Sequence, residues 1–333
     1  MAGARPGEDE LIARYFAPIA GEGALGLKDD AALLHPRPGH DLVVTADAVV
    51  SAVHFFADDP PGSIAQKALG VNVSDLAAKG AAPVGFVMTV TLPQDWTEAW
   101  LAAFCEGLGE ASRAFACPLL GGDTVRGLDT AVSITAFGEV PEGRMVRRTT
   151  ARPGDRICVS GTIGDAALGL MLRRSAAQAW ASGLSRDELA FLVDRYLHPR
   201  PRVALSPALL DHASAAMDVS DGLAGDLAKM MRASGTMATI AADDVPLSPA
   251  ARAALAADPS LFDRLVTGGD DYEILATVRP GRLAAYLAAS AAAGVATIAI
   301  GTVTEGQGLP VFRRGGEERR YERGSYSHFR DGP

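Results

Sequence analysis

Seven aspartates in this chain stand at the ends of apolar runs, and their carboxylates are suited to binding a cation. They are Asp29, Asp30, Asp47, Asp75, Asp123, Asp218 and Asp221. We expect each of them to lie where a strand meets a loop. Grouped carboxylates repel one another, and burial raises their pKa values, unless a hard cation neutralises them. Magnesium fits this role because it prefers oxygen ligands and is usually shared between carboxylates and substrate phosphates. One such aspartate alone is equally well explained as a helix N-cap, but seven together favour a metal site.

Four glycine-rich strings are candidates for phosphate binding, since glycine lets backbone N–H groups approach a phosphate closely. They are GEGALG, GGDT, SGTIGDA and GGDD. The first matches GxGxxG at Gly21–Gly26, but the element expected before it is a helix and not a strand, so a dinucleotide-binding loop is rejected. The sequence contains no Walker-type phosphate loop, no protein-kinase signature, no GxSxG and no HExxH. A Walker-type kinase is therefore excluded, and hydrolytic triads and zinc sites find no support.

Two cationic side chains are further candidates for binding phosphate. His54 follows Asp47 by seven residues in DAVVSAVHFF, from where it could reach a substrate phosphate beside the metal. A histidine among apolar residues is more often packed in a core, and the residues alone favour that alternative. Arg148 offers a forked pair of donors to nucleotide phosphates. A solvated surface arginine explains Arg148 equally well.

These candidates need a framework, and the hydrophobic spacing predicts alternating helices and strands. In the first half it predicts helices over 8–20, 64–78 and 96–115 and strands over DLVVTADAVV, VGFVMTVTL and TAVSITAFGEV. In the second half it predicts helices over 165–174 and 223–233 and strands over RICVSG, 238–241, 273–278 and 295–301. The polar, turn-rich string RTTARPGD marks a boundary, so we predict an N-terminal domain of residues 1–148 and a C-terminal domain of residues 149–333. This alternation indicates the α/β (α+β) class.

The charge balance and the cysteines bear on partners and compartment. The chain has 31 basic and 40 acidic residues and a net charge of -9, which disfavours nucleic acid and anionic membranes as partners. Residues 283–301 carry no charge, but Gly294 interrupts them, so we expect a helix, a glycine cap and a strand and no membrane span. Cys105, Cys117 and Cys158 lack CxxC spacing and stand in apolar surroundings. With no signal-peptide pattern at the N-terminus, we expect buried thiols and a cytoplasmic protein.

Two pairs of short strings recur in order along the chain. VSDLA precedes GGDT in the first half, and VSDGLA precedes GGDD in the second. An ancient duplication explains them, and so does chance in a chain rich in alanine and glycine. In either case each half offers aspartates beside glycines or small residues.

Ten strings, taken in order, resemble the thiamine-monophosphate kinase family, which belongs to a wider group of ATP-binding enzymes related to aminoimidazole ribonucleotide synthetase. They are GEDELI, DDAAL, TADAVVSAVHF, NVSDLAAKGAAP, GGDT, RTTARPGD, SGTIGDA, DVSDGLAGDL, GGDDYEIL and SYSHF, and they span nearly the whole chain. The resemblance implies an N-terminal α/β domain that pairs with its copy in a homodimer. It also implies a larger C-terminal α/β domain, with ATP held between the two.

The resemblance assigns roles to residues by position. Several magnesium ions would be held by Asp30, Thr45, the Ala46 backbone, Asp47, Asp75, Asp123, Asp218 and Asp221. ATP would contact Gly122, Asp123, Arg148 and Ser220, and thiamine phosphate would contact His54, Asp270 and Tyr326. For His54 this reverses the preference for a core position, because it falls on the VHF element typical of these kinases. Three residues depart from the family pattern: Lys28, Lys79 in place of methionine, and Asp270 in place of glutamate.

The implied reaction transfers the γ-phosphoryl group of ATP to thiamine monophosphate and gives thiamine diphosphate and ADP. The sequence offers no obvious general base, and none is needed, because a phosphate monoester with a second pKa of about 6 is largely ionised at neutral pH. One alternative is a relative that phosphorylates a carbamoylated or amidated substrate or makes selenophosphate. Such relatives share SDG and GGD elements but lack VHF and the terminal YxHF. Another alternative is a non-catalytic, acidic metal-binding protein.

Overall fold

The protein divides into two compact units in a computed structural model that describes residues 7–324. The N-terminal unit comprises residues 1–76 and 81–145, and the C-terminal unit comprises residues 77–80 and 146–333. Residues 77 and 78 are the last two of a helix that begins in the N-terminal unit. The division between the units is therefore not a single cut in the chain.

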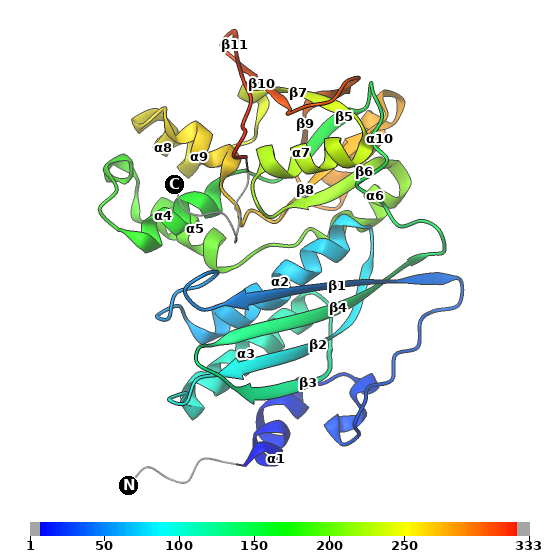
Figure 1. The fold of residues 1–333 in the computed structure, drawn as a ribbon, viewed down its shortest axis with the longest axis vertical. Coiled ribbons are helices and arrows are strands. Elements are labelled where there is room, and N and C mark those ends of the chain that lie inside the picture. Colours follow the sequence, from blue (N-terminus) through cyan, green and yellow to red (C-terminus); the bar gives the residue numbers. More distant parts are fainter. Residues whose placement is uncertain (1–6, 325–333) are drawn as a thin grey trace. The chain divides into compact units, whose positions relative to one another are not determined.

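The N-terminal unit is a four-stranded sheet in the order β1-β4-β2-β3, with two long helices on one face (Figure 1). Its elements are α1 (Glu8–Leu11), a π-helical turn (Ile12–Phe16), two 3-10 segments (Ala17–Ile19 and Glu22–Leu27), β1 (His40–Val50), α2 (Pro61–Ala78), β2 (Ala82–Leu92), α3 (Glu98–Ala114), β3 (Leu119–Arg126) and β4 (Ala131–Pro141). β4 pairs antiparallel with β1 and β2, whereas β3 pairs parallel with β2. Along β1, Val43 and Val49 are buried while Leu42 and Val44 are exposed, as expected where one face of a strand packs against helices.

One prediction for the N-terminal unit is confirmed and another is wrong. The chain is helical over residues 8–19, close to the predicted 8–20, although its turns change from α to π to 3-10 along the segment. The aspartates predicted at strand ends lie elsewhere: Asp47 and Asp123 are inside β1 and β3, and Asp75 is inside α2. GGDT therefore belongs to a strand and not to a loop, although its glycines lowered the strand signal in the sequence.

The C-terminal unit is built on a seven-stranded sheet in the order β11-β10-β7-β9-β5-β8-β6. Its strands are β5 (Arg156–Ser160), β6 (Ala213–Val219), β7 (Met237–Ala241), β8 (Glu273–Val278), β9 (Thr297–Thr304), β10 (Val311–Arg314) and β11 (Glu317–Arg319). Its helices are α4 (Asp165–Arg174), α5 (Arg186–Leu197), α6 (Ser206–His212), α7 (Leu223–Ser234), α8 (Pro249–Ala257), α9 (Leu261–Thr267) and α10 (Leu283–Ala292). All six residues of β8 are buried, because side chains pack on both of its faces.

The pattern read from the sequence agrees well with the C-terminal unit. α4 and β8 have the predicted bounds, and the charge-free segment forms α10 and β9 with Gly294 between them at a φ of 72°. All three cysteines are buried, and burial raises the pKa of each thiol to about 12. Across residues 7–324, the helices are all too short or too polar to cross a membrane. Both units combine helices with sheets, which confirms the predicted class.

Candidate active site

Three of the predicted metal ligands of the N-terminal unit lie where α2 passes beside β1. Thr45 and Asp47 are two residues apart on β1 and so point to the same face of the strand. The Thr45 hydroxyl donates to Asp75 Oδ2 on α2 at 2.5 Å, and the Asp47 backbone N–H donates to Asn72 Oδ1 at 2.9 Å. Asn72 and Asp75 are one helical turn apart on α2, so both reach β1. Ala46, between the two ligands, pairs with Thr135 of β4.

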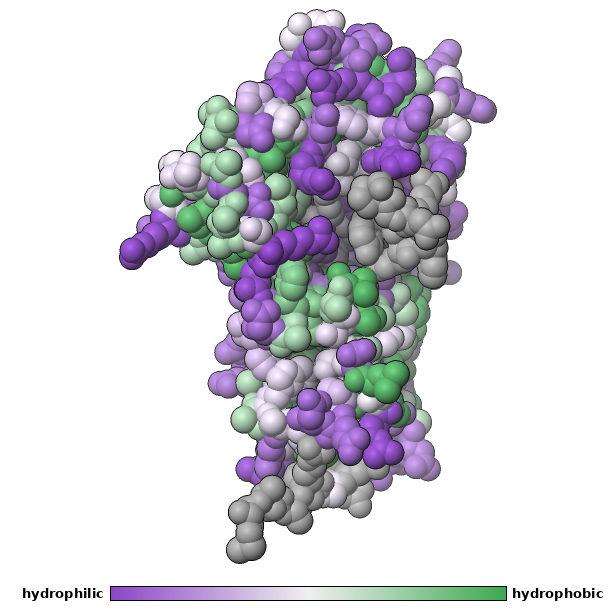
Figure 2. All heavy atoms as spheres, turned by 60° about the vertical axis from the view of Figure 1, so that its left-hand side comes forward, coloured by the Kyte–Doolittle hydropathy of each residue, from purple (hydrophilic) through white to green (hydrophobic). Residues whose placement is uncertain are grey.

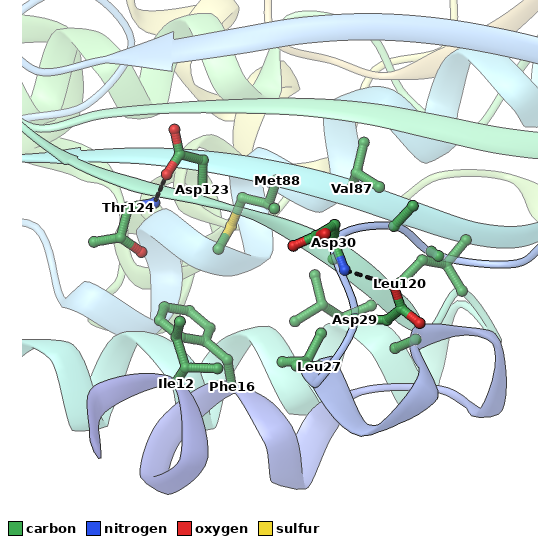
Figure 3. A pocket seen from close by; sticks show the side chains of 16 residues that line it. Ile12, Phe16, Leu27, Asp29, Asp30, Val87, Met88, Leu120, Asp123 and Thr124 are labelled. Atoms are coloured by element: carbon green, nitrogen blue, oxygen red, sulfur yellow. Dashed lines mark hydrogen bonds between the residues drawn. The ribbon is translucent and has the colours of Figure 1, made fainter. Parts of the chain in front are cut away.

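A second group of predicted ligands lines a cavity of about 370 Å³ at the other edge of the same sheet. Asp30, Gly122 and Asp123 all contribute to it, and Asp29 lies beside them. Figure 3 shows Asp30 and Asp123 on one side of this pocket, with the apolar side chains of Ile12, Phe16 and Leu27 on the other. The pocket thus combines an apolar wall with a few charged groups, as binding sites for small organic molecules commonly do.

Backbone geometry explains why a glycine occupies the middle of this pocket wall. A Cβ atom on Gly122 would lie 1.8 Å from the Met88 carbonyl oxygen, so no other residue fits without moving β2 or β3. The next residue, Asp123, accepts a hydrogen bond at Oδ1 from the Thr124 backbone N–H at 2.8 Å. The partners resolved for Asp75 and Asp123 are therefore a hydroxyl and an N–H group, both neutral.

In the C-terminal unit, the predicted ligands follow β6 in the loop that leads into α7. Asp218 is the next-to-last residue of β6 and is 5% exposed, whereas Ser220 and Asp221 lie in the loop and are half-buried. The buried Asp226 carboxylate accepts the backbone N–H groups of Ser220 and Asp221 at 3.0 and 2.9 Å. Asp226 therefore fixes the path of the loop.

A lysine pairs with two of the acids at this loop. Lys229, one turn beyond Asp226 on α7, forms ion pairs with Asp221 and with Asp226, the latter at 2.8 Å. Burial raises the pKa of Asp226, and the Lys229 ammonium partly offsets this. Burial alone would lower the pKa of Lys229, but the two carboxylates outweigh it, so that pKa is raised and the lysine stays charged.

The predicted substrate contact, Asp270, lies in the turn between α9 and β8. Its backbone N–H donates to the Ser220 carbonyl at 2.8 Å, so this turn is hydrogen-bonded to the loop that follows β6. The Tyr272 hydroxyl donates to Asp270 Oδ1 at 3.3 Å. Asp270 and Tyr272 both have positive φ values, 71° and 50°.

Three further predicted residues are less informative. His54 is half-buried in the turn after β1, where its Nδ1 accepts the Val50 backbone N–H at 3.1 Å, so it is not a fully packed core side chain. Arg148 is exposed, and its carbonyl accepts the Ser234 hydroxyl at 3.1 Å. Tyr326 lies outside the described residues. Their predicted roles stay predictions.

The donor set suits magnesium, although the carboxylates do not form a closed cage. Among residues 7–324 the structure contains no group of three or more His, Cys, Asp or Glu side chains arranged to hold a metal ion. The predicted ligands are all oxygen donors, and Lys229 already places a cation on one of them, Asp221. Magnesium commonly takes one or two protein carboxylates and completes its shell with phosphates and water. The residues present fit that mode of binding.

Comparison with known proteins covers both units. Residues 28–140 match the family described as AIR synthase related protein, N-terminal domain, and residues 152–313 match AIR synthase related protein, C-terminal domain. The chain is 42% identical to the thiamine-monophosphate kinase of Caulobacter vibrioides over 94% of this chain and 89% of that protein. The chain belongs to the thiamine-monophosphate kinase family. The resemblance seen in the sequence is thereby confirmed.

Further members of the thiamine-monophosphate kinase family show the same extent of similarity. The protein of Escherichia coli O157:H7 is 38% identical over 97% of this chain and 98% of its own length. The crystal structure of the kinase from Stenotrophomonas maltophilia K279a superposes with a TM-score of 0.82 at 38% identity, covering 93% of this chain and 96% of that one. The structure of AaThiL complexed with AMPPCP and TMP has a TM-score of 0.78 at 27% identity and covers 99% and 100% of the two chains.

One departure from the thiamine-monophosphate kinase pattern has a clear structural role. Lys79 donates from Nζ to the Ala216 carbonyl of β6 at 2.8 Å, two residues before Asp218. The lysine thus holds the strand that carries a predicted ligand. Several residues that support the candidate site were missed in the sequence. They are Asn72, Arg195, Asp226, Lys229, Asp271 and Glu273. Asn72 stands three residues before Asp75, and Asp226 five residues after Asp221. This closeness in sequence to predicted ligands was the one clue to their supporting role.

Proposed function

We propose that this protein is a thiamine-monophosphate kinase that transfers the γ-phosphoryl group of ATP to thiamine monophosphate, giving thiamine diphosphate and ADP. The observation that carries the proposal is the pocket in which Asp30, Gly122 and Asp123 meet, in a chain whose relatives along nearly its full length bear this name. The complex of AaThiL with AMPPCP, an analogue of ATP, and TMP supports the same pair of ligands.

The chain's own residues act by binding and orienting the two anions. Gly122 lets β3 pack closely against β2 at the pocket wall, and the apolar side of the pocket suits an organic group. Magnesium would be held by Asp30, Thr45, the Ala46 backbone, Asp47, Asp75, Asp123, Asp218 and Asp221. When bound, it would offset the repulsion between the two anionic substrates. A phosphate oxygen of the acceptor forms the new P–O bond, the bond to the ADP oxygen breaks, and no protein base is required.

ATP consumption that depends on the acceptor tests this function. We expect purified protein with Mg²⁺ and ATP to produce ADP only when thiamine monophosphate is added, and to produce thiamine diphosphate in equal amount. ADP formation at the same rate without an acceptor would contradict the kinase function. A lack of ATP turnover together with tight Mg²⁺ binding would favour a non-catalytic metal-binding protein.

We propose further that the chain forms a homodimer through β1. This strand is an edge of its sheet, and its residues at 42, 44, 46 and 48 are apolar and exposed on one face. Val44 is 55% exposed, and Figure 2 shows that hydrophobic side chains lie among hydrophilic ones on the face in view. An exposed apolar edge strand favours pairing with another copy. By sedimentation we expect the wild type to be a dimer and Val44→Lys to be a monomer. The control Val125→Lys, on β3, should remain a dimer. A monomeric wild type would contradict the proposal.

A cytoplasmic location is part of the same proposal. Cys105, Cys117 and Cys158 are all free and buried, which fits a reducing compartment.

A further inference from the structure

The turn that carries Asp270 has a backbone conformation that must be held in place by its surroundings. Asp270 and Tyr272 have φ values of 71° and 50°, in a region that non-glycine residues seldom occupy. Such conformations persist where neighbouring groups fix them, and they concentrate at functional sites. Two backbone hydrogen bonds, from Asp270 to Ser220 and from Tyr272 to Val219, both of 2.8 Å, hold the two ends of the turn to β6 and its loop.

A buried arginine holds the middle of the turn. Arg195 of α5 is 2% exposed, and its Nη2 donates to the Asp271 carbonyl at 3.1 Å and to Glu273 Oε1 at 3.0 Å. Its Nε and Nη1 atoms are buried and have no hydrogen-bond partner among the described residues. A guanidinium that leaves donors unmet in the interior is costly to stability. The two bonds that Arg195 does form go to Asp271 in the turn and to Glu273 at the start of β8, so the arginine holds the turn against that strand.

The residues on either side of this contact are fixed as well. The Glu273 carboxylate also accepts Arg202 Nε and the Ser160 hydroxyl, each at 2.6 Å. The fully buried Asp271 carboxylate accepts the Gly164 backbone N–H at 2.9 and 3.0 Å on its two oxygens. The three residues after Asp270 are thus anchored by hydrogen bonds. Asp270 itself is half-buried, and its carboxylate accepts a hydrogen bond from the Tyr272 hydroxyl.

The glycine-rich string SGTIGDA takes part in this anchoring. A Cβ atom on Gly161 would lie 2.1 Å from Glu273 Oε1, so the glycine makes room for the carboxylate that Arg195 and Arg202 share. The Gly164 N–H group, which the sequence offered to a phosphate, is used by Asp271. SGTIGDA therefore supports the Asp270 turn, a use of its glycines that the sequence did not suggest.

We propose that Arg195 is a positioning residue that, through the Asp271 carbonyl and Glu273, holds the 270–272 turn so that Asp270 presents its carboxylate to the thiamine moiety of the acceptor. The proposal rests on the proposed function, in which Asp270 contacts thiamine phosphate. Tyr272 completes the arrangement by orienting the Asp270 carboxylate through its hydroxyl. Arg195 touches neither substrate in this arrangement.

Steady-state kinetics of Arg195→Met and Arg195→Lys test the proposal. Losing the two charge-assisted bonds should raise KM for thiamine monophosphate about tenfold, while KM for ATP changes by less than about threefold. Arg195→Lys should recover part of the loss, because an ammonium can donate to one of the two acceptors. Arg186→Met, at the exposed start of the same helix, is the matched control and should leave both KM values unchanged.

Equal increases in KM for both substrates, no increase at all, or no recovery in Arg195→Lys would each overturn the positioning role. Should Arg195→Met fail to fold by circular dichroism, Arg195→Lys and Tyr272→Phe carry the test. Tyr272→Phe removes only the hydroxyl that bonds Asp270, and we expect KM for thiamine monophosphate to rise about threefold with kcat unchanged. A wild-type KM in Tyr272→Phe would count against the orientation of Asp270.

Asp270→Ala separates failure of this inference from failure of the proposed function. A raised KM for thiamine monophosphate in Asp270→Ala with a normal KM in Arg195→Met would refute positioning but keep the substrate contact. A normal KM in Asp270→Ala would refute both the contact and the positioning. Wild-type ATP turnover that ignores thiamine monophosphate would instead refute the proposed function itself.

Discussion

The strings shared by the two units adopt different structures in each. VSDLA lies inside α2 and GGDT inside β3, whereas VSDGLA spans the end of β6 and the start of α7, and GGDD forms the turn before β8. The extra glycine contributes to the first difference, because Gly222 adopts a φ of 114°, which lies outside the helical region and which other residues seldom adopt. Similar strings therefore present their aspartates from a helix and a strand in one unit and from loops in the other.

The partners of these aspartates differ as well. In the N-terminal unit, Asp75 and Asp123 accept from a hydroxyl and a backbone N–H. In the C-terminal unit, Asp221 is paired with the Lys229 ammonium. A carboxylate whose partners are neutral keeps its full negative charge for an external cation, whereas one with an internal ammonium is already compensated. We therefore expect the charge of Asp123 to matter more for magnesium binding than the charge of Asp221.

Substitution of Asp123 is the strongest test of this difference. Asp123→Asn keeps an acceptor for the Thr124 N–H but removes the charge, so we expect kcat/KM to fall by about a hundredfold to a thousandfold with the fold intact. Asp221→Asn should cost less, because Lys229 already compensates that charge. Asp129→Asn, an exposed acid beyond the end of β3, is the control. Equal losses in Asp123→Asn and Asp221→Asn, measured over a range of Mg²⁺ concentrations, would remove the distinction.

The stability of the two units should respond in the opposite order. Glu273→Gln leaves the Arg195 and Arg202 guanidinium groups without their shared counter-charge, and we expect the free energy of unfolding to fall by about 3–5 kcal/mol. Asp75→Asn keeps an oxygen acceptor for Thr45, so its loss should stay below about 1 kcal/mol. Urea denaturation followed by circular dichroism measures both. A loss for Asp75→Asn as large as that for Glu273→Gln would show that both units depend equally on buried charge.

Local patterns were enough to predict much of this fold. β8 is a short, mostly apolar run, and α4 begins at Asp165 and ends at two arginines, so the bounds of both were found from the sequence. β3 was missed because its middle residues are Gly121 and Gly122, which lack side chains that favour a strand. Apolar spacing was enough to find the first helical segment, but it did not reveal the change from α to π to 3-10 turns along it.

The candidate site was less predictable, because its supports are distant in sequence. Arg195 stands 78 residues before Glu273, and nothing in the local string around either residue announces their contact. The aspartates were identified from the residues around them in the sequence, but their positions inside β1, α2 and β3 were not predicted. SGTIGDA was predicted to bind phosphate, but its glycines receive the buried carboxylates of Asp271 and Glu273 instead. Glycines suit both kinds of anion equally, so the sequence could not distinguish them.

Two buried carboxyls, one in each unit, should respond to pH in opposite directions. Burial alone would raise the pKa of Glu139, but hydrogen bonds from the Arg37 side chain and backbone outweigh it and lower that pKa below its ordinary value of 4.5. Burial raises the pKa of Asp271 well above 3.8, with a smaller contribution from Asp165, against the effect of the Gly164 N–H and Arg195. Relative to a free carboxyl group, the folded protein favours the charged form of Glu139 and the neutral form of Asp271.

The smallest expected effects follow from these shifts. Glu139 adds stability at neutral pH that is lost as pH falls through its lowered pKa, so Glu139→Gln should cost about 1 kcal/mol at pH 7 and progressively less as the pH falls below 4.5. Asp271 adds stability at low pH that is lost as pH rises from 3.8 toward its raised pKa. Asp271→Asn should therefore lose less stability than the wild type as the pH rises above 3.8. Urea denaturation at a series of pH values measures how the free energy of unfolding changes with pH for each variant relative to the wild type. Changes of the same sign for the two variants would show that Arg195 holds Asp271 charged, as Arg37 holds Glu139.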